Sequence, residues 1–238
     1  MPRSAFVFVH SPLVGPSTWE PVADRFNAQR LLTSVPDLAG IAKAPVPRWP
    51  HAVVAVQQAV EALDTNEVVL LGHSGAGPLL PAIGEGLDVP VTAYVFIDAG
   101  LPAPGTATPL APPQFLEFLT DLAVEGVLPP WSQWWPLGAM KTLLPDEVVR
   151  RRIEAELPRL PLSYFKEEVP AVQGWSDARG VYLQLSAPYE DDAARAEARG
   201  WPTERLDAGH LHAVVDAEDV TARIQRLLSL AGVRASPP

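Results

Sequence analysis

The stretch LLGHSGAG, residues 70–77, sets a serine between glycines at the point where an apolar run ends. The run before it is typical of a buried strand, and residues 78–84 are apolar enough for a packed helix. Gly72 and Gly75 lack side chains and permit a sharp strand-to-helix turn that lifts the Ser74 hydroxyl out of the sheet. The same letters also fit a glycine-rich turn with a serine helix cap, so the rest of the chain has to decide between the two interpretations.

Strands and helices alternate on both sides of this turn. Apolar runs typical of buried strands stand at residues 5–10, 32–38, 67–71, 93–97, 181–185 and 204–206. Helical spacing of apolar residues marks residues 17–26, 51–63, 78–84, 191–200 and 219–230. Strict alternation implies crossover connections, so we predict an α/β fold with a mostly parallel sheet and helices on both faces.

The alternation stops between residues 103 and 175, where no convincing strand is found. Helical patches occupy residues 114–125, 145–157 and 164–169. A segment of this length is too long for a plain connection. We therefore predict a single domain, with a core of residues 1–102 and 176–238 and an inserted helical lid over residues 103–175.

The composition narrows the class of protein. Of the 238 residues, 47% are hydrophobic, the formal net charge is -10, and cysteine is absent. The negative charge argues against a nucleic-acid partner and against an anionic membrane surface. The absence of cysteine excludes disulfides and thiolate chemistry, and no apolar run reaches the length of a membrane span. We expect a cytoplasmic protein that acts on a small molecule and needs no metal or organic cofactor.

A serine hydroxyl is a poor nucleophile without a base, and the chain has 5 histidines. His210 follows Gly209 in a loop between the last strand and the final helix. A base stands there when the order along the chain is serine, acid, histidine. The side chain of His73, next to the serine, is expected to point away into packing. The other three are His10 at the end of the first strand, His51 at a helix start, and His212.

These residues make the sequence resemble the α/β-hydrolase superfamily. The matching stretches are HSPLVGPSTW at 10–19, VPDL at 35–38, LLGHSGAG at 70–77, VFIDAGLP at 95–102 and GHLHAVVDAEDV at 209–220. They follow the superfamily's order, and residues 103–175 fall where its lid usually lies. The resemblance implies Ser74 as the nucleophile and His210 as the base, with His212 as a neighbour. Residues 5–200 also resemble small actinobacterial hydrolases of unassigned substrate.

Two motif positions depart from the superfamily's pattern. The usual Gly-x-Ser-x-Gly ends here in Ala76, which is small. The loop after the first strand usually reads His-Gly-x, and the amide of x donates to the oxyanion; here residues 10–12 read HSP, and proline has no N–H. The Gly75 amide is therefore expected to be one oxyanion donor, and the Leu13 amide or the Ser11 hydroxyl is the candidate for the second.

The acid of the expected triad has two candidates. The superfamily commonly places it after the strand at residues 181–185, where Glu190 lies, but the acidic residues there also suit the first turn of a helix. Asp98 ends the strand at residues 93–97, which is the superfamily's other acid position. A lone carboxylate at the end of a buried strand is hard to explain by packing, so we favour Asp98 over Glu190.

The aromatic residues of the insertion either pack it onto the sheet or line an apolar roof over Ser74. We take Trp131, Trp134 and Trp135, together with His73, as candidate substrate-binding residues. A largely apolar pocket suits a hydrophobic or aromatic substrate without charge.

The sequence thus favours a serine-dependent hydrolase that cleaves an ester, thioester or lactone through an acyl-enzyme. Two alternatives stay open. One is a lyase or cyclase on the same scaffold that uses Ser74 and His210 for proton transfer. The other is a non-catalytic protein that keeps the fold as a ligand pocket.

Overall fold

The computed structural model describes residues 4–103 and 105–233, so the outermost ends of the predicted core and residue 104 of the predicted lid lie outside it. The central sheet consists of β1 (Ser4–Val9), β2 (Leu32–Ser34), β3 (Glu67–His73), β4 (Val91–Ile97), β7 (Gly180–Gln184) and β8 (Thr203–Arg205). Its order is β2-β1-β3-β4-β7-β8, and every pair of neighbours is parallel. The predicted α/β fold is confirmed.

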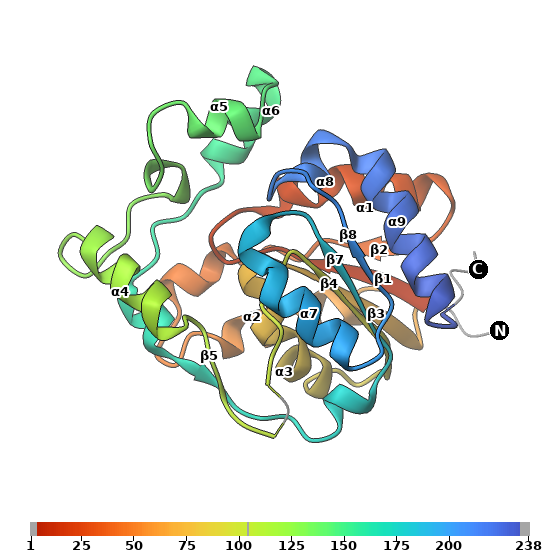
Figure 1. The fold of residues 1–238 in the computed structure, drawn as a ribbon. Helices are drawn as coiled ribbons and strands as arrows, with labels where there is room; N and C mark the ends of the chain where they lie inside the picture. The colour runs from red at the N-terminus through yellow and green to blue at the C-terminus, as the bar shows by residue number, and fades with distance from the viewer. Residues whose placement is uncertain (1–3, 104, 234–238) are drawn as a thin grey trace.

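Helices cover both faces of the sheet (Figure 1). One core lies between the sheet and α1 (Glu20–Ala28) and α9 (Ala217–Leu230). The other contains the buried faces of α2 (Pro50–Glu61), α3 (Leu80–Glu85) and α7 (Glu190–Ala198). Alternate residues of the central strands face the two cores. Along β1, Phe6 and Phe8 belong to the first core, and Val7 and Val9 belong to the second.

The segment between β4 and β7 carries α4 (Pro113–Leu122), α5 (Ala139–Leu143) and α6 (Glu147–Ala155). In Figure 1 this green segment lies to one side of the sheet, away from both chain ends. It also contains an antiparallel pair, β5 (Thr108–Pro109) with β6 (Glu168–Val169), where the sequence predicts no strand. Strands of two residues leave no readable alternation. The helix predicted over residues 164–169 is instead a 3₁₀ turn, Leu162–Lys166, followed by β6.

Proline accounts for two shifted boundaries. The strand predicted over residues 32–38 ends at Ser34, because Pro36 cannot donate to a ladder. The chain after β3 first forms a 3₁₀ helix, η3 (Ser74–Leu79). It becomes α-helical only at Leu80, which lies between Pro78 and Pro81. The longest described helix, α9, has 14 residues, and no described helix is both long and apolar enough to cross a bilayer.

Candidate active site

Ser74 stands at the turn between β3 and η3, with φ of 56°, in the left-handed region that non-glycine residues rarely occupy. Its N–H donates to the Asp98 carbonyl at 3.1 Å, and its carbonyl accepts from the Gly100 N–H at 3.3 Å. The β3–β4 ladder thus continues past both strands and fixes the strained turn. The Ser74 side chain makes no cap for η3, so the interpretation as a simple helix cap is wrong.

The close approach in this turn occurs at Gly77 rather than at Ala76. A Cβ atom at position 77 would lie 2.1 Å from the carbonyl oxygen of Gly100, whereas Ala76 packs into the core. The alanine that departs from the superfamily's pattern therefore stands where a small side chain fits.

Asp98 follows β4 and is also held at positive φ, 44°. Its side chain is fully buried, and each carboxylate oxygen has two donors. Oδ1 accepts from the N–H groups of Leu185 at 2.8 Å and Ser186 at 2.9 Å. Oδ2 accepts from the Ser186 hydroxyl at 2.5 Å and from Nδ1 of His210 at 2.6 Å. The carboxylate is thereby fixed in orientation as well as in position.

Burial is the largest influence on Asp98 and opposes its ionisation. The hydrogen bond and charge of His210 and the bonds from Ser186 and Leu185 outweigh burial, so the pKa of Asp98 lies below its usual value. Glu190, the rival acid, is exposed at the first position of α7, and its carboxylate has no recorded bond to His210. Among the described residues, the structure brings Asp98 and not Glu190 to the histidine.

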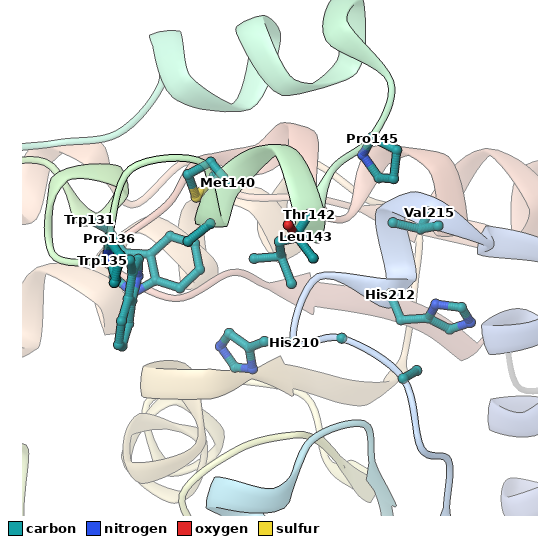
Figure 2. Close-up of a pocket in the computed structure, with 13 residues that line it drawn as sticks. Trp131, Trp135, Pro136, Met140, Thr142, Leu143, Pro145, His210, His212 and Val215 are labelled. Carbon is teal, nitrogen blue, oxygen red and sulfur yellow. The ribbon is translucent and has the colours of Figure 1, made fainter.

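The two histidines of the last loop point in opposite directions (Figure 2). The His210 ring turns toward Trp131, whose ring centroid lies 6.0 Å away, and toward the buried Asp98. His212 opens α8 (His212–Val215), and its Nε2 lies 4.0 Å from a carboxylate oxygen of Asp219. Only the first of the two imidazoles meets the Asp98 carboxylate.

A sequence profile of the alpha/beta hydrolase family matches residues 6–224. The chain belongs to this family. A search of curated proteins finds no match to it. Among solved structures, a pyrethroid hydrolase from Sphingobium faniae JZ-2 is similar at 17% identity and a TM-score of 0.73, covering 98% of both chains.

Two further solved structures resemble this chain. Polyneuridine aldehyde esterase has 15% identity and a TM-score of 0.70, with 96% of this chain and 99% of that chain covered. Tomato methylketone synthase I, solved with 2-tridecanone, has 15% identity and a TM-score of 0.70, with 98% and 99% covered. At sequence identities this low, the similarity shows a shared fold and nothing more.

His73, a candidate substrate-binding residue, lies against His210. Its Nε2–H donates to the backbone carbonyl of His210 at 2.9 Å, and the two rings have centroids 4.4 Å apart. On another side its ring meets Trp19 edge-on. Burial, followed by the nearby His210, lowers the pKa of His73 to about 3, so the imidazole is neutral at neutral pH. In this hydrolase fold, His73 contacts the backbone of His210.

The burial of neutral His73 makes the free energy of unfolding depend on pH. Because its pKa falls from 6.5 to about 3 on folding, the unfolded chain binds the extra proton between these values. We expect the free energy of unfolding to fall as pH drops through this window, by up to about 1.4 kcal/mol per pH unit from this residue. Below about pH 4, Asp98 adds to the loss, because its folded pKa is lowered too.

Urea unfolding of His73→Gln at a series of pH values between 3 and 7 measures this contribution. The glutamine amide can still donate to the His210 carbonyl but does not titrate, so its slope should be shallower than that of the wild type. His212→Gln, which removes a partly exposed imidazole, is the control for the substitution itself. Equal slopes for His73→Gln and the wild type would contradict the assignment.

Tyr189 is the residue that the sequence analysis missed. It ends a short 3₁₀ turn, η7 (Ala187–Tyr189), and its hydroxyl lies 3.0 Å from Oγ of Ser74. Its ring stacks on His210, with centroids 5.3 Å apart and planes at 7°. Within the described residues, the recorded hydrogen-bond partner of the Ser74 hydroxyl is this phenol. Tyr189 follows the strand at residues 181–185, in the loop where the sequence suggests only a carboxylate as a site residue.

The loop after β1 is organised around Ser11. The Ser11 carbonyl accepts from Nδ1–H of His10 at 2.8 Å and from the Val14 N–H at 3.0 Å. The Leu13 N–H donates to Oγ of Ser11 at 3.3 Å. That Oγ also faces the serine turn, since it lies 3.1 Å from the position that a Cβ of Gly75 would occupy. The Leu13 amide is therefore engaged inside its own loop.

A pocket of about 660 Å³ opens beside His210. It is lined by Trp131, Trp135, Pro136, Ala139, Met140, Thr142, Leu143, Pro145, Ala208, Gly209, His210, His212 and Val215 (Figure 2). Trp131 and Trp135 lie on its wall. Trp134 does not: its Nε1–H donates to the Pro129 carbonyl at 2.8 Å, and its ring packs against Phe115. The described residues contain no cluster of three or more acidic or histidine side chains that could hold a metal ion.

Proposed function

We propose that the protein is a serine hydrolase that cleaves a carboxylic ester, thioester or lactone through an acyl-enzyme on Ser74. The observation that carries this proposal is the 2.6 Å pairing of Asp98 with His210 beside a serine in a strained turn. A fully buried carboxylate that holds the Nδ1–H of His210 leaves Nε2 free to accept a proton. Packing alone would not require a buried carboxylate paired with a histidine, whereas proton transfer makes use of one.

The reaction uses the side chains in turn. As Oγ of Ser74 bonds to the carbonyl carbon, its proton passes to Nε2 of His210 and the carbonyl π electrons move to oxygen. The Gly75 N–H at the start of η3 and the Ser11 hydroxyl, whose oxygen faces Gly75, are the proposed donors to this oxyanion. When the carbonyl re-forms, the bond to the leaving group breaks and that group takes the proton from His210. Water then releases the acyl group by the same steps.

The position and lining of the pocket beside His210 favour a substrate with a hydrophobic leaving group. A leaving oxygen must lie close to the histidine that protonates it, and the pocket wall contains His210 but no residue of η3 or of the loop after β1. Apart from His210, His212 and Thr142, its lining side chains are apolar or absent. We therefore infer an ester of a bulky, uncharged, apolar alcohol, thiol or phenol.

Filling the pocket should change substrate preference. Leu143 lies on its wall, and Leu143→Trp is expected to lower kcat/KM at least about tenfold for a cyclohexyl or naphthyl acetate. A methyl ester of a longer acid should be nearly unaffected. Leu137→Trp is the matched control, because Leu137 lies in the same segment, is fully exposed and does not line the pocket. A loss confined to the long acyl chain would assign the pocket to the acyl group instead.

The segment over residues 103–175 supports the proposal of a lid. It supplies the Trp131–Pro145 wall of the pocket. Glu156 directly follows α6, and its carboxylate accepts from the N–H of Ser17 at 3.0 Å and from the Ser17 hydroxyl. A Cβ on Gly15 would lie 2.2 Å from that carboxylate, so glycine permits the contact. These two bonds tie the end of α6 to the core at Ser17.

A lyase on the same scaffold is the second candidate. It is favoured by the hydroxyl of Ser74 pairing with Tyr189 rather than with His210, and by the missing amide at Pro12. In such a reaction Ser74 and His210 would move a proton and no acyl-enzyme would form. Mass analysis of the protein during turnover separates the two candidates.

A further inference from the structure

Tyr189 contacts both members of the proposed acyl-transfer pair. Its hydroxyl lies 3.0 Å from Oγ of Ser74, and its ring lies parallel to that of His210. Burial is the main cause that raises the pKa of Tyr189, with further contributions from Asp98 and Asp192, so the phenol stays protonated. A phenol is more acidic than an alcohol. Either hydroxyl can donate in this bond. When the protonated phenol of Tyr189 donates, the serine proton stays available for His210.

The sheet order separates Tyr189 from the oxyanion loop. In the order β1-β3-β4-β7, the loop after β1 and the turn after β7 approach Ser74 from opposite sides of β3. Ser11 belongs to the first of these loops and Tyr189 to the second. The phenol consequently does not take the place of the missing Pro12 amide; it acts on Oγ itself.

We propose that Tyr189 is a catalytic residue that donates to Oγ of Ser74 and thereby favours breakdown of the acyl-enzyme. This inference rests on the proposed serine hydrolase function. When the enzyme is acylated, Oγ becomes the alkyl oxygen of an ester, which is a weak acceptor. When the C–Oγ bond breaks, its electron pair returns to Oγ, the proton arrives from His210, and the phenol regains a strong acceptor. The donor thus stabilises the free serine relative to the acyl-enzyme.

Tyr189→Phe tests this role because it keeps the ring on His210 and removes only the hydroxyl. With p-nitrophenyl butyrate, whose leaving group is good, we expect acylation to be fast and breakdown of the acyl-enzyme to limit kcat. We expect kcat to fall about 3- to 10-fold, as for loss of one hydrogen bond, while kcat/KM is unchanged or higher. The burst of p-nitrophenol should grow, and intact mass spectrometry should find a larger acylated fraction at steady state.

Tyr164→Phe is the matched control. The Tyr164 hydroxyl is buried without a recorded partner and lies outside the pocket wall, so its removal should leave burst and kcat at wild-type values. Thermal unfolding of each variant separates a folding defect from a change in chemistry.

Two results would overturn the role of Tyr189 alone. One is unchanged kcat and burst in Tyr189→Phe. The other is an equal fall in kcat and kcat/KM without accumulation of acyl-enzyme. In both, a fluorophosphonate still labels Ser74 of the wild type, which shows that the serine mechanism stands. If the wild type neither turns over esters nor reacts with the fluorophosphonate, the proposed function and the role of Tyr189 both fail.

Discussion

His210→Ala is expected to lower kcat for ester hydrolysis by about 10⁶, the loss that follows removal of the base from a serine triad. The alanine leaves Ser74 without a proton acceptor. It also leaves the leaving oxygen without a proton donor, because within the described residues only this imidazole carries the Asp98 bond and faces the pocket. The backbone carbonyl that accepts from His73 is retained, so the loop keeps that anchor. Steady-state kinetics with a p-nitrophenyl ester measure the loss.

His212→Ala is the control for this prediction. His212 also lines the pocket, but it lies beside Asp219 and points away from the site (Figure 2). Its removal should shift KM and leave kcat within a few-fold of the wild type. A severe loss in His212→Ala together with a mild loss in His210→Ala would exchange the two assignments.

Asp98→Asn should lower kcat by about 10⁴ while the protein stays folded. The amide oxygen can keep the two backbone donors at Leu185 and Ser186, which bind Oδ1 in the native protein. The amide NH₂ then occupies the place of Oδ2, where it donates to Nδ1 of His210 instead of accepting from it. His210 is forced into the tautomer that carries its proton on Nε2, and it can no longer take the proton of Ser74.

Glu190→Gln is the matched control, since it makes the same chemical change at the exposed start of α7. It should leave kcat unchanged, and circular dichroism should find both variants folded. A strong effect of Glu190→Gln with a mild effect of Asp98→Asn would move the acid to Glu190. Mild effects in both would leave a serine–histidine pair without a carboxylate.

The sequence predicts that two site residues are neighbours when each directly follows the end of one of two adjacent strands. Carboxyl ends of neighbouring parallel strands meet at one edge of a sheet, so Ser74 after β3 and Asp98 after β4 are predictable neighbours. Their shared positive φ and the hydrogen bond between their backbones complete this local order. The assignment of His210 also rested on the resemblance to a family, because the sequence of the loop that carries this histidine has no periodic pattern.

The contacts that the sequence does not reveal depend on side-chain direction in loops. Tyr189 reaches Ser74 from a 3₁₀ turn, and nothing in its neighbourhood in the sequence indicates which way the ring points. Three tryptophans lie close together in η4 (Trp131–Gln133) and directly after it: Trp131, Trp134 and Trp135. Only the first and the last of them line the pocket. Trp134 is turned away by its bond to Pro129. Composition places such aromatics near a site but does not orient them.

The central claim is that Ser74 carries the acyl group during turnover. The most direct test is to quench the wild-type enzyme with acid during hydrolysis of p-nitrophenyl butyrate and to map the mass increase by peptide mass spectrometry. We expect a butyryl adduct on Ser74, absent from Ser74→Ala and enriched in Tyr189→Phe. Turnover that requires His210 but leaves Ser74 unmodified under every quench condition, including in Tyr189→Phe, would contradict the acyl-enzyme mechanism and favour the lyase.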